Sequence, residues 1–118
     1  MGASLTESAG TIRHASVAAS SSGSNTLLAA PIDGSSIRVL AYVLVATSQV
    51  TAKFVSDTSN QVDLTGAMPL GDRGGVAAGW NPGGWFQAGS NKALCLVLGS
   101  GVAVAGHFTY QYVGKTGN

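Results

Sequence analysis

The side chains able to perform acid–base or metal chemistry are few and far apart in the sequence. His14 and His107 have no cysteine or carboxylate at the spacing of metal ligands. Asp57, Asp63 and Asp72 each stand beside a turn, where aspartate commonly bonds to the backbone, and none adjoins a second acid that could share general acid–base work. We therefore expect no enzymatic activity, no cofactor and no metal site.

The single cysteine, Cys95, lies within the apolar run Leu94–Leu98. A lone cysteine cannot form an intramolecular disulfide, and free cysteines commonly behave as small buried hydrophobic residues. A nucleophilic cysteine would need a helper base, and neither histidine belongs to a catalytic signature. We therefore expect a buried thiol, in a protein that folds in a reducing cytosol.

An aromatic loop is the most distinctive candidate site. Two tryptophans and one phenylalanine flank the turn sequence Asn-Pro-Gly-Gly between Gly79 and Phe86. Three interpretations stay open. Trp85 and Phe86 can anchor the loop to the edge of the core and leave only Trp80 near the surface, the rings can fill a partner's pocket, or they can stack on sugars. The candidate partner-binding residues are Trp80, Asn81, Pro82 and Trp85.

The segment Gly71–Gly75 places an acid and a base, Asp72 and Arg73, at a glycine-rich tip. It lacks the Gly-Lys-Ser/Thr ending of a phosphate-binding loop, and no helical pattern follows it. The segment is therefore either a solvated turn or one half of an ion pair between subunits. Asp72 and Arg73 are retained as candidate partner-binding residues.

The composition is poor in charge. Only 9% of the 118 residues are charged and 45% are hydrophobic, whereas a typical soluble protein has about 25% charged residues. The six basic residues are dispersed and the net charge is +1, so we expect no nucleic-acid binding, which needs a clustered basic surface. No apolar run is long enough to span a bilayer, and the first ten residues lack the pattern of a secretion signal. We expect part of this surface to be covered by a partner or a sister subunit.

The hydrophobic pattern has a period of two, which is typical of half-buried strands. In Val102–Val113, every second residue is apolar or aromatic. Ile37–Ala46 is apolar on both faces apart from Arg38, which predicts a central strand covered on both sides. The further expected strands are Thr11–Ala19, Thr26–Ala30, Val50–Ser56, Gln61–Thr65 and Leu94–Leu98. The predicted fold is all-β, an antiparallel β-sandwich or jelly-roll-like small barrel over residues 11–118, with an extended N-terminal arm over 1–10.

Turn signals separate these strands. Ser20–Asn25 is a flexible turn by composition. Thr47–Ser48, Asp57–Asn60 and Gly99–Gly101 are each expected to close a hairpin between the strands on either side.

Several segments together resemble small virion proteins of tailed bacteriophages, in particular capsid decoration (cement) proteins with a β-sandwich or jelly-roll fold. The resemblance spans roughly residues 35–113 and rests on Ile37–Ala46, Val50–Phe54, Asp63–Leu70, Gly74–Val76, Asn81–Phe86, Lys92–Leu98 and Val102–Tyr110. These motifs are structural rather than chemical, so they indicate a fold family more specifically than a function.

The resemblance implies a non-enzymatic homotrimer, made in the host cytoplasm, that binds the major capsid protein on the capsid exterior and stabilises the shell. The arm and one open end of the sandwich are the expected capsid contacts, with Gly2, Ala3, Ser4 and Leu5 as candidate residues in the arm. Two alternatives remain: a head-fibre or tail-associated protein, and a carbohydrate-binding module that uses Trp80 and Trp85.

Overall fold

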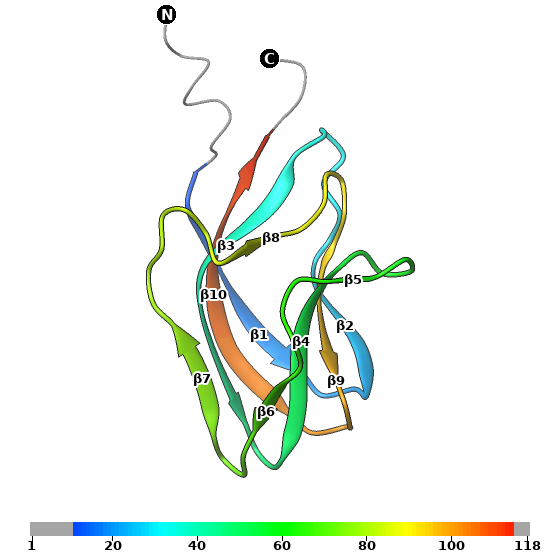
Figure 1. Ribbon diagram of the computed structural model, residues 1–118, viewed down its shortest axis with the longest axis vertical. Coiled ribbons are helices and arrows are strands. Elements are labelled where there is room, and N and C mark those ends of the chain that lie inside the picture. Colours follow the sequence, from blue (N-terminus) through cyan, green and yellow to red (C-terminus); the bar gives the residue numbers. More distant parts are fainter. Residues whose placement is uncertain (1–10, 115–118) are drawn as a thin grey trace, which may run out of the picture.

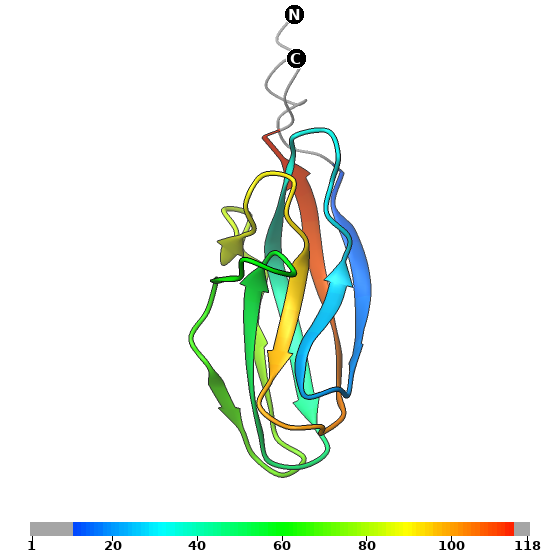
Figure 2. The same ribbon diagram turned by 90° about the vertical axis from the view of Figure 1, so that its right-hand side faces the viewer.

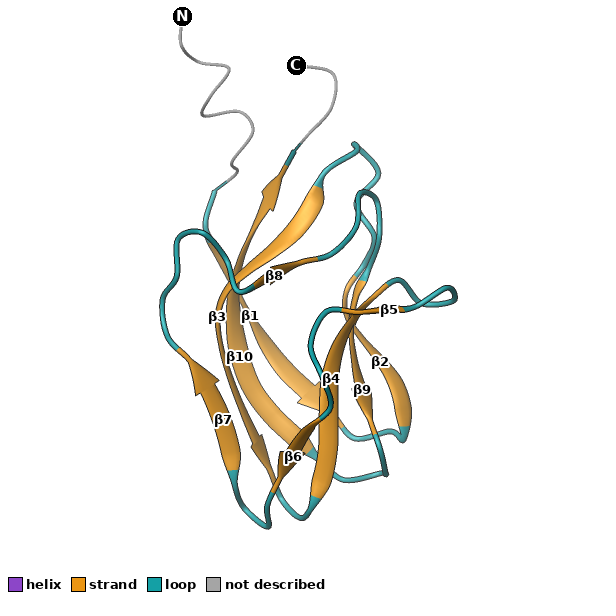
Figure 3. Ribbon diagram, in the orientation of Figure 1, coloured by secondary structure: helices purple, strands orange, loops and turns teal. Residues whose placement is uncertain are grey.

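The structure, a computed structural model, describes residues 11–114, and these form strands and loops without a helix (Figure 3). The predicted arm over residues 1–10 lies outside the described residues. The strands are β1 (Arg13–Ala19), β2 (Gly23–Leu28), β3 (Ser36–Ala46), β4 (Val50–Ser56), β5 (Val62–Asp63), β6 (Met68–Leu70), β7 (Gly75–Ala78), β8 (Phe86–Gln87), β9 (Leu94–Leu98) and β10 (Val104–Val113).

The strands form two antiparallel sheets packed face to face (Figure 1). Sheet A has the order β1-β10-β3-β7, with β8 also paired to β3. Sheet B has the order β2-β9-β4-β5, with β6 also paired to β4. β5 and β6 both pair with β4 and form one interrupted edge strand, and β7 and β8 both pair with β3 and form another. Counted in this way, the chain forms two four-stranded sheets with jelly-roll connections. The all-β sandwich expected from the sequence is confirmed.

Two of the three predicted hairpins are wrong. Thr47–Ser48 joins β3 to β4 and Gly99–Gly101 leads from β9 towards β10, but the strands of each pair belong to different sheets. Only Asp57–Asn60 precedes a strand that pairs with its predecessor, since β5 pairs with β4. A turn sequence indicates where the chain reverses, but it does not determine whether the next strand pairs with the last or crosses to the facing sheet.

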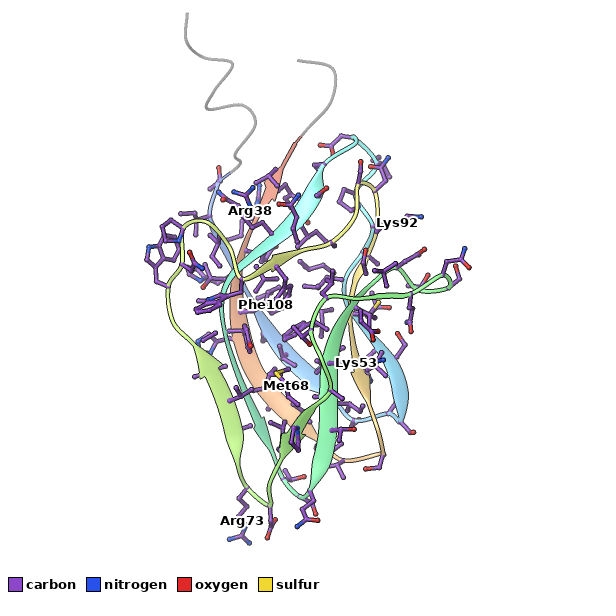
Figure 4. All side chains as sticks on the ribbon, viewed as in Figure 1. Arg38, Lys53, Met68, Arg73, Lys92 and Phe108 are labelled. Carbon is purple, nitrogen blue, oxygen red and sulfur yellow. The ribbon has the colours of Figure 1, made fainter. Side chains whose placement is uncertain are left out.

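The core lies between the sheets and follows the period-two pattern. Phe108, labelled in Figure 4, is fully buried, as are Phe54 and Leu44. The rings of Tyr42, Phe54 and Phe86 cluster, with centroids 5.1 Å apart for Tyr42–Phe54 and 4.8 Å for Phe54–Phe86. This cluster joins both sheets and fixes β8, since Phe86 is anchored there.

A second, smaller apolar cluster lies on the outer side of sheet B. It comprises Val55, Ala93 and Cys95, with Val97 packed against it. The thiol of Cys95 is fully buried, which confirms the buried thiol expected from the sequence. The segment after β4 is tied to this side of the sandwich by an ion pair of 3.0 Å between Lys53 and Asp63.

Candidate functional site

The aromatic loop connects β7 to β8 and so interrupts the edge strand of sheet A. β7 pairs with the C-terminal half of β3, and β8 pairs with its N-terminal half. Between them, the Asn81 amide donates to the Leu40 carbonyl oxygen over 2.9 Å, and the Trp85 amide donates to the Val39 carbonyl oxygen over 2.8 Å. Both ends of the turn are therefore held on the edge of β3.

The turn at the tip of the loop is locked by its own residues. The Gly84 amide donates to the Asn81 carbonyl oxygen over 2.9 Å, and the Gly83 amide donates to Asn81 Oδ1 over 3.1 Å. Gly84 has φ +84°, and a Cβ there would lie 2.5 Å from Cγ of Arg38. Proline at position 82 fixes one more backbone angle. The loop is thus preorganised, and glycine is required at position 84 both by conformation and by space.

Both tryptophans are exposed. Trp80 has 57% and Trp85 51% of its surface accessible, and the indole N–H of Trp85 donates to the Gly79 carbonyl oxygen over 2.8 Å. The interpretation in which Trp85 and Phe86 anchor the loop to the edge of the core, with only Trp80 near the surface, is wrong for Trp85, because its ring is nearly as exposed as that of Trp80 and bonds to the loop itself. Phe86 alone performs that role. The loop therefore exposes apolar surface of both indoles.

Asp72 and Arg73 occupy a separate site, the turn between β6 and β7. The Gly74 amide donates to the Gly71 carbonyl oxygen over 2.9 Å, and Arg73 has φ +56°. Within residues 11–114 the ion pairs join other residues, Lys53 with Asp63 and Lys92 with Asp57. In Figure 4, Arg73 and Arg38, the neighbour of the aromatic loop, lie towards opposite ends of the sandwich. The fold therefore does not combine this turn and the loop into one site.

The remaining candidates, Gly2, Ala3, Ser4 and Leu5, lie outside the described residues. An open depression beside the β6–β7 turn is lined by neutral side chains, among them Gln49, Thr51 and Ser100. It offers hydrogen-bonding groups, including the hydroxyls of Thr51 and Ser100, and its lining residues include no His, Asp, Glu, Lys or Cys that could act as an acid or base beside them.

A surface without Asp, Glu, Lys or Arg lies on part of the outer side of sheet A, and sequence reasoning missed it. Two rows of directly paired residues cross the four strands: Ala18, Ala105, Val45 and Gly75 in one, and Ser16, His107, Val43 and Ala77 in the other. Paired residues point to the same side of a sheet, and here that side faces away from the core. We call the side chains of these rows the sheet A face: Ser16, Ala18, Val43, Val45, Ala77, Ala105 and His107.

The sheet A face corrects the expectation that β3 is covered on both sides. Val45 is 47% accessible, and its neighbours Ala105 and Ala77 are also exposed. The sequence signal was present as the two-sided apolar pattern of β3, but a central strand covered on both sides gives the same pattern. The outer side of sheet B differs, since the Lys53–Asp63 ion pair and the cluster around Cys95 occupy it.

The titratable groups give no indication of a reaction centre. Burial raises the pKa of the Tyr42 hydroxyl, and burial is also the main cause that raises the pKa of Tyr112. The pKa of Asp57 is lowered, chiefly by the hydrogen bond from the Thr58 amide. Among residues 11–114, no three His, Cys, Asp or Glu side chains lie close enough to hold a metal ion.

Comparison of the chain with protein-family models, with curated proteins and with solved structures found no significant match. Within the part of the chain that the structure describes, no helix has the length and apolarity needed to cross a membrane.

Proposed function

We propose that this protein is a non-enzymatic virion structural protein that binds in many copies to the outer surface of a bacteriophage capsid, contacts the major capsid protein and stabilises the shell. The observation that carries the proposal is the sheet A face, a surface of small and apolar side chains from four strands that is free of Asp, Glu, Lys and Arg. The sequence resemblance to decoration proteins supports the same function. The aromatic loop lies on the edge of the same sheet.

The chemistry of the sheet A face suits contact with another protein. The cores of protein interfaces are depleted of charged residues, because a charge that loses its water without a partner is costly. Val45 and Val43 offer apolar area, while Ala105, Ala77 and Ser16 leave the backbone close to the surface. Burial of such a face against a partner costs little side-chain entropy, since Ala has no rotamers and Val few.

Stabilisation of a shell requires each copy to hold neighbouring capsid subunits together. Many modest contacts repeated over a symmetric lattice give a large total resistance to separation, and simultaneous contacts raise the apparent affinity of each copy. In this protein the sheet A face and the exposed aromatic loop are two surfaces that can serve such contacts.

The test is binding to empty capsids assembled from the major capsid protein of the same phage. Val45→Lys places a charge in the middle of the sheet A face and should abolish co-sedimentation of the protein with these capsids. Ser59→Lys adds the same charge at an exposed position of the β4–β5 turn, and it should bind like the wild type. Wild-type protein that fails to co-sediment would refute the proposal, as would equal binding of the two variants. Imaging of intact virions would then distinguish a head decoration from a head fibre or a tail-associated protein.

A second candidate function is carbohydrate binding, favoured by the exposure of both indoles on a locked loop. Aromatic faces stack on sugars, and neighbouring polar groups give them specificity. Such groups are present, because Arg38 Nε donates to Gln87 Oε1 over 3.1 Å beside the loop. Binding on a glycan array that is lost in both Trp80→Ala and Trp85→Ala, with the fold intact, would support this function. An array without signal would count against it.

A further inference from the structure

The edge strand β1 has features that the three other sheet edges lack. It pairs with β10 over all seven residues, Arg13 to Ala19, without a register shift. The opposite edge of sheet A is interrupted by the aromatic loop between β7 and β8. In sheet B, β2 contains a register shift between Thr26 and Leu28, while the other edge is formed by the short strands β5 and β6. β1 is therefore the longest regular edge among residues 11–114.

Exposed edges of sheets present unpaired amide and carbonyl groups, and proteins that stay monomeric usually blunt them with lysine, proline or a bulge. From His14 to Ala19, β1 contains none of these devices, and its only charge, Arg13, stands at one end. In Figure 2, β1 runs along the right-hand margin of the sandwich with no described segment outside it. This edge is geometrically ready to accept another strand.

We propose that β1 pairs with β1 of a second copy of this chain, antiparallel, across a two-fold axis at Ser16. Two-fold symmetry makes the same strand available on both copies and produces an antiparallel pair. In this register Arg13 lies opposite Ala19 of the second copy, His14 opposite Ala18, Ala15 opposite Val17, and Ser16 opposite its own counterpart.

The register follows from the faces of the strand and from its charge. Residues must pair with residues of the same face, so that Val17 and Ala19 stay on the core side. Among the registers that satisfy this condition, the one centred on Ser16 pairs all seven residues. It also places the two Arg13 side chains at opposite ends, about 20 Å apart along the strands, which exceeds the screening length of about 8 Å at physiological salt. The central residues Ala15, Ser16 and Val17 are small, and the larger side chains of Arg13 and His14 each stand opposite an alanine.

This contact would make one continuous sheet from the two copies. Because the two-fold axis is perpendicular to the sheet, the two sheet A faces lie on the same side and adjoin along β1. The proposal does not depend on the function proposed above, although the two adjoining sheet A faces would strengthen contact with any partner. It differs from the trimer implied by the sequence resemblance, because a three-fold contact cannot pair β1 with itself.

Cysteine cross-linking tests the register directly. Opposed residues of an antiparallel pair have Cα atoms about 4.5–5.5 Å apart, within the range of about 4.4–6.8 Å for disulfides. Under mild oxidation, Ser16→Cys should therefore form a disulfide-linked dimer. Ala18→Cys is the matched control, since residues 18 of the two copies would be about 13 Å apart along the strands. Both sites are exposed, and the native Cys95 is fully buried.

Failure of Ser16→Cys to cross-link would overturn the proposal. Equal cross-linking of the two cysteine variants would do so as well, because it would indicate random collision rather than a defined register.

Light scattering behind a sizing column provides an independent measurement without oxidation. The wild type should have twice the chain mass of 11.7 kDa. Ser16→Lys places two like charges directly opposite each other and should reduce the mass to that of a monomer, while Ser59→Lys should remain dimeric. A wild type that is monomeric at all concentrations would refute the contact. Disruption by Ala105→Lys but not by Ser16→Lys would also refute it, because it would indicate packing through the sheet A face.

Discussion

The indole N–H of Trp85 donates a hydrogen bond of 2.8 Å to the carbonyl oxygen of Gly79. This bond ties the end of the aromatic loop to its beginning across six residues. Together with the turn held by Asn81, it keeps both indoles in place although about half of each is exposed. The loop is therefore ordered by hydrogen bonds within it and to β3 rather than by burial of its tryptophans.

Replacement of Trp85 by phenylalanine keeps an aromatic ring and removes the donor. Because the bond is half exposed, its loss should lower the free energy of unfolding by no more than about 1 kcal/mol, which corresponds to a melting temperature lower by about 4 °C for a domain of this size. Trp80→Phe is the control, since no hydrogen bond from its indole is observed among the described residues. Thermal unfolding should separate the two variants, and equal melting temperatures would show that the Trp85 bond does not contribute.

Gly106 allows β10 to approach β3 closely. A Cβ at this position would lie 1.8 Å from the Val43 carbonyl oxygen, so Gly106→Ala must displace one of the two central strands of sheet A. We expect a loss of about 3 kcal/mol, the upper part of the range for overpacking. Gly66→Ala is the control, because nothing lies within 4 Å of the added methyl group, and its effect should stay within about 0.5 kcal/mol. Urea unfolding of both variants tests the difference, and similar midpoints would contradict it.

The sequence predicted a strand best where apolar and polar residues alternate along that strand itself. In β10, Val104, Phe108 and Tyr110 are buried while Ala105 and His107 are exposed, as the period-two pattern indicates. The alternation ends at the register shift between Thr109 and Tyr110, since Thr109 and Gln111 are buried as well. β6, β7 and β8 were not predicted. β7 consists of Gly, Val and two Ala, and β8 has two residues, so neither carries a local pattern. They are strands because β3 offers an edge to pair with, which is a property of the assembled fold.

The candidate site was predicted less well, for the same reason. The aromatic loop was identified from its residues, but the exposure of Trp85 depends on a hydrogen bond to Gly79 and on the path of the loop along β3. The sheet A face is formed by residues from four strands that are brought together by pairing. The two-sided apolar pattern of β3 is its one sequence signal, and a central strand covered on both sides gives the same pattern. Ala and Ser in the other strands are equally compatible with a solvated surface.

Asp57 makes the free energy of unfolding depend on pH in the acidic range. Its pKa is lowered from the ordinary value of 3.8, first by the hydrogen bond from the Thr58 amide and further by Lys92. A carboxyl group with a lower pKa in the folded state adds stability that is complete above its unfolded pKa. That stability is lost as the pH falls through the folded pKa.

In Asp57→Asn, the free energy of unfolding should therefore fall below that of the wild type by a constant amount near neutral pH, and this difference should decline once the pH drops below about 4. Asparagine tolerates the φ of +83° at this position, so the backbone is unchanged. Lys92→Gln is the comparison variant and should keep part of the pH dependence, because the Thr58 bond, the largest single cause, remains. Denaturant unfolding across the acidic range measures both, and a difference that persists to low pH would contradict the assignment.

Arg73 occupies a left-handed conformation, φ +56°, in the turn between β6 and β7, and such a conformation costs a non-glycine residue about 1 kcal/mol. Arg73→Gly should therefore raise the free energy of unfolding by up to that amount. Asp72→Gly, at a position without positive φ, should lower it slightly, because glycine gains more freedom in the unfolded chain. Chemical denaturation would show opposite signs for the two variants. If Arg73 instead forms an ion pair with a partner, the stabilised Arg73→Gly variant should bind capsids more weakly than the wild type, and unchanged binding would leave the turn without a role in contact.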